Sequence, residues 1–254
     1  PTFLARTRDK MRQSVVDQMA LMRLLSAGDG TNALIDFDGD GVPDNYGPIR
    51  VIAHSLGAIL ATSLVAVSPE VDRVLLNVPG AHLTQIINDS PRLSKDIDLL
   101  IYASAGATGI GLLAGSPRYM IPDGPERELF SRVSETILAP IDPESFAAGL
   151  VSGALGGSSP RVLVQFALGD DVVTNLGNVR YAQALAAGAE EADEVVTVGK
   201  ELFPLGLPVV PAEASLPPIA FAEFAGGHGM LLDFVDPAVT TAVQTQAGLF
   251  FASP

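Results

Sequence analysis

The sequence predicts an α/β fold with a mostly parallel sheet and helices on its faces. Four short runs of apolar and β-branched residues, at 49–53, 72–78, 162–168 and 219–224, are separated by segments with helical periodicity. The 254 residues, 48% of them hydrophobic, suit one large α/β domain with a substantial core better than two small domains.

The helices are predicted from apolar residues that recur every three or four positions. Before the first strand, Met11, Val15 and Met19 have this spacing, with charged residues between them. After the second strand, Pro79-Gly80 ends the extended run. The helices that flank the four strands are predicted over 8–25, 57–67, 177–188 and 236–251.

The long stretch between the second and third strands is predicted to be an insertion. Residues 81–160 are too many for a loop in a compact domain. Helical patterns occur in this stretch at 83–87, 97–103, 128–138 and 146–150. We therefore predict a core made of residues 1–80 and 161–254, with a helical cap formed by 81–160.

Ser55 lies at the turn between strand 49–53 and the helix that follows. Small residues stand two positions before it and two after it, at Ala53 and Gly57. This pattern is typical of a nucleophile elbow, a sharp strand-to-helix turn that presents a serine hydroxyl at the edge of a sheet. We expect Ala53 and Gly57 to be small because strand and helix approach closely there. The alternative is a βα turn that merely contains a serine.

A reactive serine needs a base and a carboxylate that orients the base, and later segments offer both. His228 stands in a glycine-rich loop directly after strand 219–224, and Asp170 and Asp171 end strand 162–168. The other two histidines have simpler interpretations. His54 is expected to pack beside the elbow with its side chain away from the serine. His82 is expected to be a loop residue that either contacts water or lines the pocket.

The elbow, the acid and the histidine, in this order, resemble the α/β-hydrolase family in its esterase and lipase branch, over residues 8–251. The run 12–17, the acidic loop before the elbow strand and the run 76–80 add a likeness to bacterial secreted or surface lipases. The resemblance implies that Ser55 is the nucleophile, His228 the general base and Asp170 the orienting acid. It favours Asp170 over Asp171 because Val173-Thr174 stands where the family has a Val-Pro-like step.

The activity implied by this resemblance is hydrolysis of carboxylic esters through an acyl-enzyme, without an organic cofactor. The Leu56 N–H would supply one oxyanion donor. The apolar segment 99–115 would face acyl chains or hydrophobic polyesters, unless it is a helix buried within the cap. Two alternatives remain open: a serine peptidase or amidase of the same fold, and a catalytically silent binding module.

The resemblance also implies that part of the fold is supplied from elsewhere. The family has several strands before the elbow strand, whereas only one helix and an acidic loop precede Ser55 here. A second oxyanion donor normally comes from one of those early loops. We therefore expect the missing strands and this donor on an N-terminal fragment of the same protein. A shortened variant of the fold is the alternative.

The acidic loop ahead of the elbow strand predicts a calcium site. Its aspartates alternate along the chain, so that hard oxygen ligands can converge on one cation, and Gly41 permits the sharp turn. Gly47 stands where a complete EF-hand has its bidentate acid, which excludes a full EF-hand. A solvated acidic turn is the alternative. The candidate ligands are Asp36, Asp38, Asp40, Val42 through its carbonyl, and Asp44.

Charge and composition restrict the classes of molecule that the protein is expected to bind. The formal net charge is −14, from 15 Lys and Arg against 29 Asp and Glu, which argues against nucleic acid and anionic lipid. No apolar run reaches the ~20 residues that span a bilayer. An acidic chain without cysteine fits a secreted or bacterial envelope protein. We expect a small-molecule or polymeric ester as the substrate.

Overall fold

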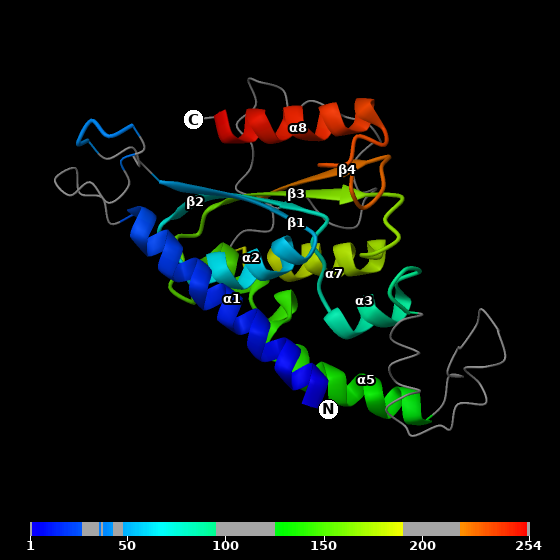
Figure 1. Ribbon diagram of the computed structural model, residues 1–254. Coiled ribbons are helices and arrows are strands. Elements are labelled where there is room, and N and C mark those ends of the chain that lie inside the picture. Colours follow the sequence, from blue (N-terminus) through cyan, green and yellow to red (C-terminus); the bar gives the residue numbers. More distant parts are fainter. Residues whose placement is uncertain are drawn as a thin grey trace.

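The described part of the chain is built on one parallel sheet. A computed structural model describes residues 2–26, 36, 38–42, 48–94, 125–189 and 219–252. Within these residues the strands lie in the order β1-β2-β3-β4, and each pairs in parallel with the next (Figure 1). The predicted α/β fold with a parallel sheet is confirmed. The strands are β1 Ile49–His54, β2 Val71–Asn77, β3 Arg161–Ala167 and β4 Ile219–Phe224.

Helices cover both faces of this sheet. Helix α8 (Pro237–Ala252) lies on one face, and α2 (Leu56–Ala66) and α7 (Asn175–Ala186) lie on the other (Figure 1). On the α2 side, α1 (Thr2–Ser26) crosses outside α2 and reaches α5 (Pro125–Leu138). The other described elements on that side are α3 Leu83–Asp89, α6 Ala147–Ser152 and two short 3-10 turns, η2 Ala139–Ile141 and η3 Pro143–Ser145.

Most observed element bounds fall within a few residues of the predicted ones, and α1 differs most. It begins at Thr2 rather than at residue 8. The buried side chain of Leu4 packs in a cluster with Leu138 and Ile141, so contacts with a distant segment extend the helix beyond its own apolar pattern. The predicted helix at 97–103 and the apolar segment 99–115 lie outside the described residues.

Alternate residues of the strands form a core on each face of the sheet. Towards α2 and α7, side chains such as Val74, Val164 and Phe166 pack in one large cluster. Towards α8, Leu75 and Leu163 pack against Phe250. This alternation with burial on both faces is expected of a parallel sheet between two helical layers.

Part of the predicted cap belongs to the main core. Ala147 and Leu150 of α6 are fully buried in the same cluster as Val65 and Tyr181. Helix α6, which falls within the predicted cap, thus packs with the main core. That the rest of 81–160 forms a cap stays a prediction.

One row of side chains on the α8 face is covered unevenly. Strand register places Ile52, Leu75, Leu163 and Ala220 side by side. Leu75 and Leu163 are fully buried, whereas Ile52 is 55% exposed. Among the described residues, no strand pairs with the outer edge of β1. Helix α8 thus covers β2 to β4 and leaves the strand that leads into Ser55 partly open.

Candidate active site

Ser55 occupies the turn between β1 and α2 in a strained conformation. Its backbone angles are φ 55° and ψ −124°, which residues other than glycine rarely adopt. Its N–H donates to the carbonyl of Asn77 at 2.9 Å, and its own carbonyl accepts the N–H of Ile59 at 3.0 Å. The serine therefore closes the strand pairing and starts the helix, as the predicted elbow requires.

The carboxyl ends of the parallel strands bring three distant residues together. His228, in the loop after β4, has its Nε2 2.6 Å from the Oγ of Ser55. The Nδ1 of the same ring lies 2.9 Å from both carboxylate oxygens of Asp170, in the loop after β3. The geometry is that of a hydrogen-bonded serine, histidine and aspartate set.

The chemistry of the three side chains determines which atom donates in each of these hydrogen bonds. An ionised carboxylate can only accept, so the Nδ1–H of His228 donates to Asp170. The neutral ring then presents an Nε2 lone pair to the Ser55 hydroxyl, which donates to it. The arrangement can take a proton from the serine as its oxygen forms a bond.

Asp170 is held in place by its own loop. Its side chain is completely buried, and its Oδ1 accepts the N–H groups of Val172 and Val173, both at 2.8 Å. Asp171 instead is exposed, and its carbonyl accepts from the N–H of Arg92. Of the two aspartates that the sequence offered, Asp170 is the one that meets His228.

The loops that carry the acid and the histidine are tied to each other. Leu168 N–H donates to the Phe224 carbonyl at 2.9 Å, and Gly169 N–H donates to the Gly226 carbonyl at 2.8 Å. A Cβ on Gly169 would lie 3.0 Å from that same carbonyl oxygen, so only glycine permits this approach without displacement. The contact fixes the spacing between Asp170 and His228.

Leu56 is the first residue of α2, and Gly57 is the second. The first N–H groups of a helix have no intrahelical acceptor, so the Leu56 N–H is available at the edge where Ser55 Oγ lies. The expected crowding at Gly57 is wrong for the part of the chain that the structure describes: a Cβ built there meets none of its atoms within 4 Å. No strand within the described ranges pairs with the outer edge of β1, which leads into this turn.

The other two histidines make polar contacts of their own. His54 bonds through Nδ1 to the Oδ1 of Asn77 at 2.7 Å, and its ring centroid lies 5.2 Å from that of His228. His82 Nδ1 lies 2.7 Å from Arg180 Nη1 and 3.3 Å from a carboxylate oxygen of Glu144. His82 therefore belongs to an ionic cluster on the α3 side, away from the serine contacts.

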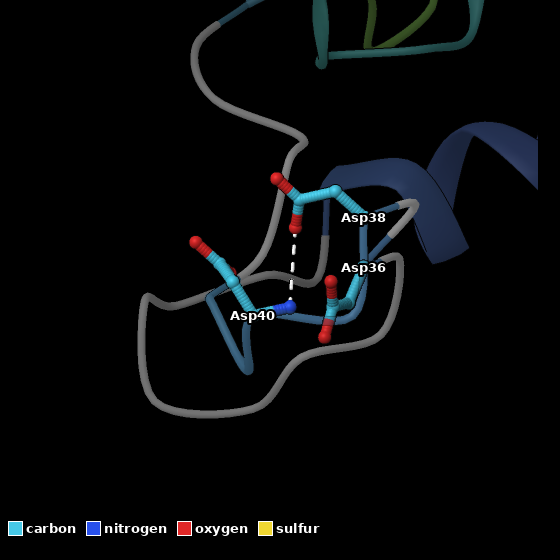
Figure 2. A group of neighbouring side chains, drawn as sticks. All are labelled: Asp36, Asp38 and Asp40. Atoms are coloured by element: carbon cyan, nitrogen blue, oxygen red, sulfur yellow. Dashed lines mark hydrogen bonds between the residues drawn. The ribbon is translucent and has the colours of Figure 1, made fainter.

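The acidic loop gathers three of its aspartates. Carboxylate oxygens of Asp36, Asp38 and Asp40 lie within 4.8 Å of one another (Figure 2). Backbone N–H groups of Gly41 and Gly39 bond to Asp36 and lower the pKa of its carboxyl, which favours the ionised form. Oxygen ligands at this spacing fit a hard divalent cation. Asp44, a further predicted ligand, lies outside the described residues.

Sequence reasoning missed the polar residues behind the elbow. Asn77 ends β2 and bonds both to His54 and to the backbone of Ser55, and Gln165 of β3 bonds to Asn77. An amide side chain inside an otherwise apolar strand, as in Leu76-Asn77-Val78 and Val164-Gln165-Phe166, is the signal that could have indicated them.

Comparisons with known proteins give likeness in structure only. No protein-family model matches the sequence, and no curated protein matches it. A puromycin hydrolase superposes with a TM-score of 0.49 at 16% identity, over 94% of this chain and 25% of its own. An esterase of Pyrococcus furiosus gives 0.47 at 11% identity, over 94% and 62%. An enol-lactonase of Burkholderia xenovorans gives 0.34 at 14% identity, over 78% and 65%.

This chain thus spans 25% of the puromycin hydrolase and 62% of the esterase. Among the residues that the structure describes, no helix combines the length and the apolar character needed to cross a bilayer.

Proposed function

We propose that the chain carries the catalytic residues of a serine hydrolase that cleaves carboxylic esters, of the α/β-hydrolase type and its lipase-like branch. One observation supports this above the others. The His228 ring lies between the Ser55 hydroxyl, at 2.6 Å, and the buried Asp170 carboxylate, at 2.9 Å. A serine on a strained elbow is equipped for nucleophilic attack when it bonds to a histidine that a carboxylate orients.

In the proposed reaction, Ser55 Oγ attacks the ester carbonyl while His228 Nε2 takes the hydroxyl proton. Asp170 keeps the ring in the tautomer with Nε2 free and stabilises the imidazolium that forms. The imidazolium then protonates the departing alcohol, and an acyl-serine remains. Water gives a proton to His228 as it attacks the acyl carbonyl. The imidazolium then returns that proton to Ser55 Oγ as the acyl–serine bond breaks, which releases the carboxylic acid and the free serine.

The developing oxyanion needs donors on the side of the elbow opposite to His228. The N–H of Leu56, next to the nucleophile, is one. Loss of one such donor typically costs on the order of 100- to 1,000-fold in rate. We propose that an upstream segment of the same protein supplies the second donor. The space at Gly57 and the outer edge of β1, which no described strand pairs with, support this proposal.

The surface beside that edge is suited to receive such a segment. Between β1 and α8 lies an apolar groove of about 500 Å³. Exposed Ile52 lies in it, beside the fully buried neighbours that α8 covers. A parallel strand from that segment could pair with the outer edge of β1, and the helix connected to it could cover this groove. The groove is lined by Ile52, Ala53, His54, Leu231, Leu232, Gln244, Ala247, Gly248 and Phe251.

The exposed residues around the triad favour a hydrophobic ester. Leu56 adjoins the nucleophile, Leu168 precedes the acid by two residues, and Leu232 follows the base by four. They are 54%, 36% and 63% exposed. Apolar side chains at these places can bind acyl chains, which supports esters of fatty acids or hydrophobic polyesters. The acidic composition is the support for a secreted or envelope location.

A structural calcium ion in the acidic loop is part of the proposal. Asp36, Asp38 and Asp40 would hold it, and its positive charge would relieve repulsion among their carboxylates. The ion would stiffen the entry to β1 and take no part in the chemistry.

A fluorophosphonate probe tests the function. Intact-mass measurement is expected to show one adduct on this chain, absent from Ser55→Ala, and p-nitrophenyl esters to turn over faster than matched peptide anilides. Faster turnover of anilides would instead support a peptidase. Absence of both adduct and turnover, with the upstream segment present, would support a binding module.

A further inference from the structure

A row of polar side chains crosses the sheet directly behind the elbow. Strand register places His54 beside Asn77, and Asn77 beside Gln165, on the face that α8 covers. Asn77 and Gln165 are completely buried, and Gln246 of α8 is 3% exposed. The proton transfers proposed above use none of these side chains, yet each has a hydrogen-bond partner in the next.

The bonds run without a gap from helix α8 to the residue before the nucleophile. Gln165 Nε2 donates to the backbone carbonyl of Val243 at 3.1 Å and to Gln246 Oε1 at 2.9 Å. Asn77 Nδ2 donates to Gln165 Oε1 at 3.0 Å, and Asn77 Oδ1 lies 2.7 Å from His54 Nδ1. A buried amide whose polar groups are all satisfied in this way holds one orientation.

The carbonyl of Val243 sets the direction of the whole row. A carbonyl oxygen can only accept, so the amide nitrogen of Gln165 faces it and the amide oxygen faces Asn77. Asn77 must then donate to Gln165 and present its own oxygen to His54. His54 consequently carries its proton on Nδ1 and donates it to Asn77.

Asn77 forms two hydrogen bonds with residues of the elbow, one through its backbone and one through its side chain. Its backbone carbonyl accepts the N–H of Ser55 at 2.9 Å, and its side chain accepts from His54. The serine holds φ 55°, a conformation that persists only where neighbours impose it. The His54 ring also lies next to the ring of His228: the two ring centroids are 5.2 Å apart, and the ring planes are inclined by 50°.

We propose that His54, Asn77 and Gln165 form a positioning brace that sets the Ser55 hydroxyl against His228 and connects this geometry to α8. The inference rests on the proposed hydrolase function. His54 is here a positioning residue, because its Nδ1 proton is engaged by Asn77. The brace acts through the hydrogen bond that His54 donates to Asn77, and not through the packing of the His54 ring.

Two substitutions of His54 separate the hydrogen bond from the packing. His54→Asn keeps an N–H donor on the atom bonded to Cγ, where Nδ1 stood, and loses the ring. His54→Phe keeps the ring and loses the donor. If the brace acts through its hydrogen bond, kcat for a nitrophenyl ester falls up to about 100-fold in His54→Phe and much less in His54→Asn, with KM unchanged in both. The reverse order, or equal activity in both variants and wild type, would overturn the proposal.

A spectroscopic measurement keeps this inference separate from the proposed activity. Nitrogen NMR of histidine-labelled protein, at a pH where the rings are neutral, is expected to show His54 as the Nδ1–H tautomer. The His54 signal is identified by its loss in His54→Asn. An Nε2–H tautomer would reject the brace even if the enzyme is active. If the tautomer is as expected and wild-type protein takes no fluorophosphonate, the hydrolase function fails and the brace remains.

Discussion

The Asp170 carboxylate meets Nδ1 of His228 with both of its oxygens at 2.9 Å, although the two residues lie 58 positions apart. The side chain of Asp170 is completely buried, and two backbone N–H groups of its own loop also bond to it. These bonds hold the carboxylate in one orientation. The acid is thereby fixed before any substrate binds.

Exchange of the acid for an amide should inactivate the chain without unfolding it. In Asp170→Asn the remaining oxygen can still accept the N–H groups of Val172 and Val173, but the amide cannot enforce the correct tautomer of His228. We expect kcat for ester hydrolysis to fall on the order of 10⁴-fold. Asp171→Asn is the matched control, because its side chain is exposed, and should leave kcat within a few-fold. Similar losses in both variants would contradict the assignment of the acid.

Two glycines near the site should respond in opposite ways to alanine. Gly57 lies in α2 with open space beside it, so Gly57→Ala should leave the unfolding free energy unchanged or raise it by up to ~1 kcal/mol. A Cβ on Gly80 would lie 2.6 Å from Ile86 Cδ1 and 2.7 Å from Val173 Cγ1. Gly80→Ala should therefore lower the unfolding free energy by about 1–3 kcal/mol, as overpacking does.

Denaturant unfolding measures both effects. A loss in Gly57→Ala comparable to that in Gly80→Ala would contradict the open geometry at the elbow. If the upstream segment packs beside β1 as proposed, Gly57→Ala should become destabilising when that segment is present. The same measurement on the longer protein tests this.

Calcium should stabilise the chain through the acidic loop. Calcium at about 100 times its Kd would add about 2.7 kcal/mol to the free energy of unfolding, and chelator would remove this gain. Asp40→Ala should abolish the response, because it removes one of the three clustered carboxylates. Asp17→Ala, on α1, removes the same charge elsewhere and should keep it. A melting temperature independent of calcium in wild type would refute the site.

Stability at alkaline pH should depend on Tyr181. Its hydroxyl is buried against Thr62 Oγ1 at 2.8 Å, and burial raises the pKa of Tyr181 above its usual value of 10.0. The folded state therefore holds this proton more tightly than the unfolded state. The resulting contribution to stability is complete below pH 10.0 and is lost progressively as the pH rises above it.

Tyr181→Phe removes this dependence at the cost of one hydrogen bond, about 1 kcal/mol at neutral pH. Between pH 10 and 11, we expect the unfolding free energy of wild type to fall more steeply with pH than that of the variant. The other tyrosines are common to both proteins, so the difference isolates Tyr181. Parallel slopes in urea titrations across this range would contradict the prediction.

Much of the site was accessible from the sequence because its signals are local. The flanks of Ser55 predict an elbow, and each partner directly follows a strand pattern, so parallel strands had to bring Asp170 and His228 to the same edge. The strands themselves followed from runs of apolar residues. The choice between Asp170 and Asp171 depended on resemblance, since adjacent residues have nearly the same local pattern.

Other features could not be predicted from local sequence patterns, because they depend on contacts with residues from distant parts of the chain. Leu4 lies in a helix that begins earlier than its spacing indicates, because α5 and the following turn cover it. Gly57 has the expected residue type but not the expected crowding. The polar row from His54 to Gln165 exists only through strand register, which periodicity alone does not determine.

The sequence by itself determined the α/β class, the elbow at Ser55 and the order of the candidate residues, because hydrophobic periodicity and turn chemistry are properties of short segments. Only the tertiary structure decided which aspartate meets His228, how Asn77 holds the nucleophile from behind, and that β1 lies at an edge left open by the described chain. These depend on through-space distances and on burial, which form when segments far apart in sequence pack together.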